Sequence, residues 1–290
     1  MAEVDLLASY WSVSGAQPHS DREYSPYDFR ERVEAIARAG FRGMGIWHAD
    51  LERVQQKYTL AEMKRILDAN GIVHVELEFL LDWFMDGEER VVSDHQRRLL
   101  LEAAEGLRAR HIKIGDFFKR ACPMPRLVES FAQLCDEGAQ RGTRIVLELM
   151  PFSVIDTLEG ALALVEGADA PNGGIIFDLW HVVKLGIPYD AVARVAPRFL
   201  LGVELNDGWL DWEPGHALAP ADALHLETIN HRQLCGEGEF DVRGFVAALQ
   251  RAGYRGPWGI EVLSQALRER PLEEMVQRSF RSTRAQFAPG

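Results

Sequence analysis

Four carboxylates lie near the ends of short apolar runs in the second half of the chain. Glu148 lies in IVLELMPF, Asp178 in GGIIFDLWH, Glu204 in LLGVELND and Glu261 in WGIEVL. In a strand of a parallel barrel, one set of alternate side chains packs on the surrounding helices and is apolar. The other set faces the barrel axis and turns polar near the C-terminal mouth. The apolar neighbours of the four acids take the helix-facing positions, so we expect the acids to point inward and converge.

Such a group of buried anions predicts a bound cation. Carboxylates that are left alone in a barrel would repel one another and would be costly to desolvate. Oxygen ligands suit hard or borderline metals, so we expect one divalent ion, with Mn²⁺ as the first choice and Mg²⁺, Co²⁺ or Zn²⁺ as the others. The alternative for any single acid is neutralisation by an arginine or lysine inside the barrel.

Other side chains are predicted to face the same mouth. Lys113 in HIKIGDF and Glu78 in IVHVELEFL either bind substrate hydroxyls or form a buried Lys–Glu pair. Trp47, His48 and Trp180 follow or close strands at the same end, where they either contact a sugar or pack at the rim. We expect the histidines of the region after the seventh strand to be solvated, namely His216, His225 and His231.

The elements that must position these residues alternate along the whole chain. Short β-rich runs are followed by longer segments of helical periodicity, which is typical of βα units around a parallel sheet. The predicted strands are Asp5–Tyr10, Gly43–Trp47, Ile72–Phe79, Ile112–Phe117, Arg144–Met150, Gly174–Leu179, Phe199–Leu205 and Trp258–Val262. The predicted helices are Tyr27–Arg38, Leu60–Asn70, Ser93–Ala109, Arg126–Arg141, Leu158–Glu166, Pro188–Ala196, Asp241–Ala252 and Pro271–Phe287.

This order favours an α/β fold, a single (β/α)8 TIM barrel domain over residues 1–290. Glycines end several of the helices, in ARAGFRG, DANGIV, AQRGTRIV and QRAGYRG, as expected where a helix turns into the next strand. The longest irregular stretch is predicted between Gly208 and Glu239, and a stretch of that length in a compact domain is typical of an active-site cover.

Composition excludes several kinds of partner. The net charge of −12 and the pI near 5.3 argue against binding to nucleic acid or to an anionic membrane surface. No apolar run reaches the length of a membrane span, and the first residues lack the pattern of a signal peptide, so a cytoplasmic location is expected. Three unpaired cysteines are expected to be reduced and structural: Cys122, Cys135 and Cys235.

The same segments resemble a known family. VLELMPF, FDLWH, GVELND and the run CGEGEFDVRGFVAALQRAGYRGPWGIEVLS are similar to the xylose isomerase-like TIM barrel superfamily of sugar phosphate isomerases and epimerases. The resemblance covers most of the chain and is strongest from Ile145 onward. It implies a metal held by Glu148, Asp178, Glu261 and the residue at position 204, where the family commonly has histidine.

The resemblance also implies a reaction. Glu148 and Glu261 would be ligands as well as the acid and base that move a substrate proton through a metal-bound enediolate, and His181 would face the substrate. The expected enzyme is an isomerase or epimerase of a monosaccharide, keto sugar or related polyol. Because Glu204 replaces a histidine, we expect a weaker preference for Zn²⁺ or a role for Glu204 in binding substrate.

Three alternatives remain at this point. The first is a dehydratase or lyase acting on an inosose, a 3-keto sugar or a dehydroshikimate-like acid, which uses the same site. The endonuclease branch of the superfamily needs several histidines at strand ends, and this chain has few. A non-catalytic binding protein is disfavoured by the intact carboxylates. A homodimer and a homotetramer stay open.

Overall fold

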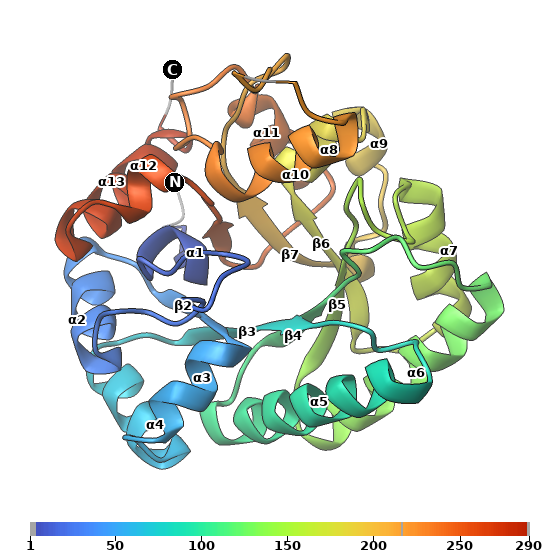
Figure 1. Ribbon diagram of the computed structural model, residues 1–290, viewed down its shortest axis with the longest axis horizontal. Coiled ribbons are helices and arrows are strands. Elements are labelled where there is room, and N and C mark those ends of the chain that lie inside the picture. Colours follow the sequence, from blue (N-terminus) through green and yellow to red (C-terminus); the bar gives the residue numbers. More distant parts are fainter. Residues whose placement is uncertain (1–3, 216, 289–290) are drawn as a thin grey trace.

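The computed structural model of the protein describes residues 4–215 and 217–288. Eight parallel strands pair in sequence order, and the eighth pairs with the first, which closes a barrel (Figure 1). The strands are β1 (Leu6–Ala8), β2 (Gly43–Trp47), β3 (His74–Leu80), β4 (His111–Ile114), β5 (Arg144–Glu148), β6 (Gly173–Asp178), β7 (Leu200–Leu205) and β8 (Trp258–Ile260). The predicted (β/α)8 TIM barrel is confirmed.

Helices surround the barrel and also follow the ends of several strands (Figure 1). The surrounding helices are α2 (Phe29–Ala39), α4 (Leu60–Ala69), α5 (Gly87–Leu107), α6 (Met124–Gln140), α7 (Leu158–Ala168), α9 (Tyr189–Val192), α11 (Val242–Arg251) and α13 (Leu272–Ala285). Others come soon after a strand: α1 (Tyr10–Val13), α3 (His48–Gln55), α8 (Leu179–Lys184), α10 (Pro220–Asn230) and α12 (Gln265–Arg268). A short 3₁₀ helix, Pro197–Phe199, precedes β7.

The alternation of side chains along the strands separates the core from the barrel axis. Leu147, Phe177 and Val203 face the helices and belong to the main hydrophobic core. Val146 and Ile176 have the opposite parity and form a small separate apolar cluster. They precede the carboxylates of β5 and β6 by two positions, so they fill the axis beneath them.

Glycine ends the helices where the sequence indicates it. Gly40, Gly71, Gly142 and Gly253 all have positive φ, at 109°, 70°, 69° and 88°. An L side chain rarely adopts this left-handed conformation, whereas glycine does so without a Cβ penalty. These turns lead the chain directly into β2, β3, β5 and the segment before β8.

The prediction that residues 208–239 are irregular is wrong in part, because α10 occupies Pro220–Asn230. Proline is tolerated in the first turn of a helix, where its missing N–H has no partner to lose. The predicted helix 188–196 shortens to α9, and the helix predicted from Ser93 begins earlier, at Gly87. His216 lies outside the described residues. None of the described helices is long and apolar enough to cross a membrane.

Candidate metal centre and active site

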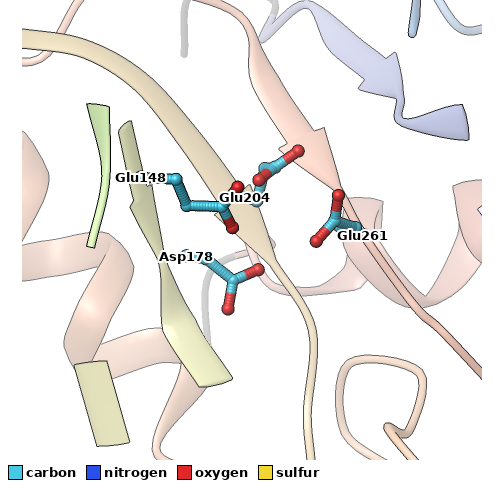
Figure 2. Close-up of side chains that lie close together, drawn as sticks. All are labelled: Glu148, Asp178, Glu204 and Glu261. Carbon is cyan, nitrogen blue, oxygen red and sulfur yellow. The ribbon is translucent and has the colours of Figure 1, made fainter. Parts of the chain in front are cut away.

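The four carboxylates converge at the ends of β5, β6, β7 and β8. One oxygen from each of Glu148, Asp178, Glu204 and Glu261 lies within 4.8 Å of the others, and all four residues are buried. Figure 2 shows their carboxylates pointing toward a common space. Asp178 also caps α8, since its Oδ1 accepts a hydrogen bond from the His181 N–H at 3.1 Å. The four carboxylates therefore converge as the alternation of side chains along the strands predicts.

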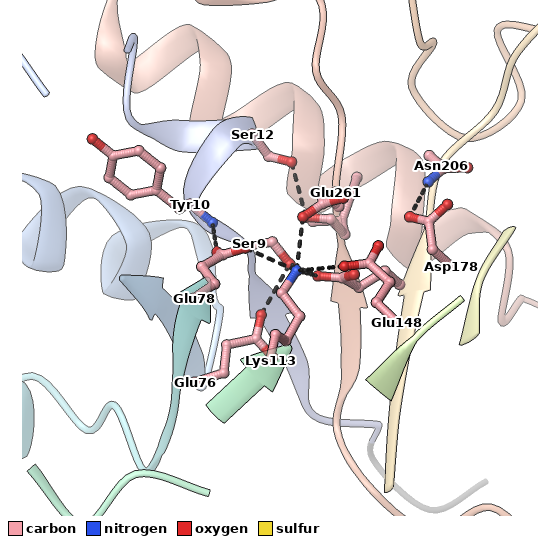
Figure 3. Close-up of polar contacts among 12 residues, drawn as sticks. Ser9, Tyr10, Ser12, Glu76, Glu78, Lys113, Glu148, Asp178, Asn206 and Glu261 are labelled. Carbon is pink, nitrogen blue, oxygen red and sulfur yellow. Dashed lines mark hydrogen bonds and ion pairs between the residues drawn. The ribbon is translucent and has the colours of Figure 1, made fainter. Parts of the chain in front are cut away.

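Lys113 lies among these acids, at the end of β4 (Figure 3). Its Nζ is 2.7 Å from Glu204 Oε1, 2.9 Å from Glu261 Oε1 and 2.8 Å from Glu78 Oε2. The side chain is fully buried and does not line the cavity described below. Lys113 and Glu78 thus form the buried Lys–Glu pair that was one of their two expected roles, and Glu78 also lines the cavity described below.

Arg232 supplies a second buried cation, which the sequence analysis missed. Its Nη1 donates to Asp178 Oδ2 at 2.9 Å and to Glu261 Oε2 at 3.1 Å, and its Nη2 lies 3.3 Å from His181 Nε2. Arg232 comes from the segment after α10, where one arginine between polar neighbours carries no periodic signal. Trp180 is fully buried and packs against this guanidinium, 5.3 Å away, so it does not line the cavity.

These contacts separate the pKa values of the acids. Burial raises the pKa of Glu148 to about 7. Burial also opposes ionisation of Glu261, but Lys113 and Arg232 outweigh it and lower the pKa of that carboxyl to about 2. Burial and the neighbouring Glu261 raise the pKa of Glu204 well above its usual range. In the metal-free protein, Glu148 therefore holds a proton more readily than Glu261 does.

The donor set fits a divalent cation. Oε2 of Glu204 is buried and has no hydrogen-bond partner among the described residues. When ionised, the four carboxylates outnumber the two buried cations beside them, Lys113 and Arg232, and a divalent ion would offset this excess of negative charge. All ligands would be oxygens, the set preferred by hard metals. Glu148, Asp178, Glu204 and Glu261 can therefore hold a divalent metal.

A cavity of about 290 Å³ opens beside the cluster. Its lining includes Glu148 and Glu261 but not Asp178 or Glu204. Two of the four carboxylates can thus reach a bound molecule, while the other two remain behind them. The predicted substrate-binding residues that line the cavity are Glu78, Trp47, His48 and His181.

Histidines at the cavity rim differ from expectation. His225 of α10 lines the cavity together with His19, and their ring centroids are 4.7 Å apart. His225, which was predicted to be solvated, is half-buried, because the unexpected helix carries it over the barrel mouth. His231 stacks on Trp212 at 4.8 Å.

Comparison with known proteins agrees with the fold and begins with a relative in sequence. The 3-dehydroshikimate dehydratase of Pseudomonas aeruginosa is 28% identical over 261 residues, which cover 87% of this chain but 39% of that protein. The chain thus spans about two-fifths of the length of this curated relative.

Two solved structures share the fold. A structure of the IolI protein with a bound zinc atom superposes with a TM-score of 0.81 at 15% identity, over 97% of each chain. The 3-keto-D-glucoside 4-epimerase YcjR from E. coli superposes with a TM-score of 0.69 at 18% identity, over 98% of this chain and 99% of that one.

The sequence pattern of one family spans most of the chain. It matches residues 33–286, from within α2 to the end of α13, and so includes all four carboxylates. The chain belongs to the xylose isomerase-like TIM barrel family.

Proposed function

We propose that the protein is a metal-dependent isomerase or epimerase of a keto sugar or related polyol. The observation that carries this proposal is the division of the cluster: Glu148 and Glu261 line the cavity, while Asp178 and Glu204 lie behind them. Carboxylates that served only to hold a metal would not need to reach the cavity. Two that reach it can also exchange protons with a bound molecule.

A divalent metal bound by the four carboxylates would polarise a substrate carbonyl and acidify the adjacent C–H. Glu148 and Glu261 both reach the cavity, and one of the two would remove that proton. The other would return a proton to the other face or to the neighbouring carbon. His181 lies 3.3 Å from Glu148 Oε1 and would orient it.

A second candidate uses the same first step. If the substrate carries a hydroxyl on the next carbon, the electron pair left by the proton can form a C=C bond while that hydroxyl leaves as water after accepting a proton. The likeness in sequence to a 3-dehydroshikimate dehydratase supports this lyase reaction, on a dehydroshikimate-like acid, an inosose or a 3-keto sugar.

Incubation in D₂O with Mn²⁺ separates these reactions. The isomerase or epimerase should incorporate deuterium next to the carbonyl and give a product of otherwise unchanged formula. The lyase should give a product lighter by one water with new ultraviolet absorbance. Absence of deuterium exchange and of water loss across a panel of keto sugars, inososes and 3-dehydroshikimate would contradict both.

A further inference from the structure

Two parts of the cavity differ in chemistry. The four carboxylates come from β5 to β8. Another part of the lining is formed by what we call the aromatic wall: Trp11, Trp47, Phe79, Phe117 and Phe152. These rings come from β2, β3 and the segments that follow β1, β4 and β5.

The rings of the aromatic wall contact one another in sequence. Trp11 and Trp47 lie 4.9 Å apart between ring centroids, Trp47 and Phe79 6.4 Å, Phe79 and Phe117 5.0 Å, and Phe117 and Phe152 6.2 Å. Phe79 is nearly parallel to both Trp47 and Phe117, with interplanar angles of 28° and 21°. Trp11, Trp47 and Phe79 belong to a hydrophobic cluster separate from the main core.

The aromatic wall leads directly to the proposed reaction centre. Phe152 contacts the His181 ring at 5.7 Å, and His181 lies 3.3 Å from Glu148. One bound molecule can therefore touch the carboxylates and the wall at once.

The polar groups of His48 and Trp47 beside the wall already have partners. His48 Nδ1 accepts from the Phe79 N–H at 3.4 Å, and its Nε2 pairs with Gln96 Nε2 at 3.1 Å. The indole N–H of Trp47 donates to Glu23 Oε2 at 3.3 Å. Hydroxyls placed against these two residues would lose water without gaining equivalent hydrogen bonds, which is costly.

We propose that the substrate is an aryl glycoside of a keto sugar: a sugar ring with its carbonyl at the carboxylates, carrying a flat apolar group seated on the aromatic wall. Offset or parallel contacts between aromatic rings favour such a group beyond the apolar area that it buries. The cavity volume of about 290 Å³ lies near the lower end of pockets for drug-sized ligands, so it has room for more than one ring. This inference rests on the proposed function for the reaction at the sugar ring.

Binding of two probes tests the inference without turnover. Phenyl β-D-glucoside and methyl β-D-glucoside present the same sugar, and only the first carries an aromatic group. Calorimetric titration of the full-length protein with saturating Mn²⁺ should give at least tenfold tighter binding of the phenyl glucoside, the lower bound expected for burying such a ring. The Phe117→Ala variant should lose most of this ratio.

Phe287→Ala is the matched control, because Phe287 is also partly buried and packs on Trp258 outside the cavity. It should keep the full ratio. Equal affinities for the two glucosides, no detectable binding of the phenyl glucoside, or an equal loss in both variants would overturn the inference. A phenyl preference without deuterium exchange on any keto sugar would instead overturn the proposed function and leave this inference in place.

Discussion

Glu148 and Glu261 lie at the two ends of the carboxylate cluster, and each has a different buried partner. His181 contacts Glu148, whereas Lys113 and Arg232 contact both oxygens of Glu261. The difference in pKa between the two glutamates in the metal-free protein follows from these contacts and from burial.

Glu148→Gln and Glu261→Gln should each lower kcat by about 10² to 10⁴, because amide groups of the same size cannot exchange the proton. Circular dichroism should show an unchanged fold. Glu273→Gln, an exposed glutamate of α13, should leave kcat unaltered. Near-normal turnover by either cavity variant would show that the two-glutamate mechanism does not operate here.

Glu78, together with Glu148 and Glu204, makes the stability of the metal-free protein depend on pH. Burial raises the pKa of Glu78 to about 8 and that of Glu148 to about 7, so the folded state keeps protons that the unfolded chain loses near 4.5. The raised pKa of Glu204 acts in the same direction. Stability should therefore fall as pH rises toward 8. Below about 6.5 the buried His181 and His48, with pKa values lowered by burial to about 3 and about 4, act in the opposite direction.

The net decrease should thus appear between about pH 6.5 and 8, where the histidines no longer contribute. Urea unfolding in EDTA across this range should show a falling free energy of unfolding, and Glu78→Gln should reduce the slope. A wild-type stability that rises through this window would contradict the assignment.

At the scale of the elements, β2 lies very close to its neighbours at Gly45, and this leaves space for the Glu78 side chain. A Cβ at Gly45 would lie 2.8 Å from both Glu78 Oε1 and the Tyr10 backbone nitrogen. Only a residue without a side chain leaves Glu78 its contacts with Lys113 and with the Tyr10 N–H.

Gly45→Ala should therefore destabilise the protein by about 1–3 kcal/mol, the usual cost of overpacking a buried site. The control is Gly215→Ala, since a Cβ at Gly215 meets no atom of the described residues within 4 Å. Urea unfolding of both variants gives the comparison. A Gly45→Ala protein as stable as the control would mean that β2 can shift at no cost.

Strand parity was sufficient to predict the barrel and the convergence of its four acids. Glu148 and Glu204 alternate with apolar neighbours, and that period is a local property of the sequence. Arg232 could not be found in this way, because its role depends on where a segment outside any strand returns over the mouth. The position of His225 could not be predicted either. Its helix, α10, has no clear apolar face, so the sequence does not indicate that a helix forms there.

The cations that offset the charge of the acids around Glu204 also could not be predicted from the sequence. Counted alone, four carboxylates and a divalent ion predict a strongly anionic site. Lys113 belongs to β4 and Arg232 to a distant segment, and only the closed barrel brings both to the acids. The choice between substrate binding and an ion pair for Lys113 was likewise undecidable from HIKIGDF.

For the whole molecule, the site joins the last four strands, so a bound metal should stabilise the entire barrel. A ligand at a hundredfold excess over its Kd adds about 2.7 kcal/mol. In a chain of 290 residues that corresponds to a rise in Tm of roughly 4–5 °C. Differential scanning calorimetry with Mn²⁺ and then EDTA measures it.

Asp178→Asn should lose this rise, because a neutral amide is a weaker ligand. Glu273→Gln removes one negative charge on the surface and should retain it. An equal rise in both variants would mean that the metal stabilises the protein through its net charge of −12 instead of through the carboxylate cluster.

The most direct test of the central claim is the position of the metal in a crystal. An anomalous-difference map from crystals soaked in Mn²⁺ should show one strong peak within about 2.5 Å of carboxylate oxygens of Glu148, Asp178, Glu204 and Glu261, beside the cavity. A map with no peak at these four residues, or with manganese bound only elsewhere, would contradict the metal centre and the reaction proposed for it.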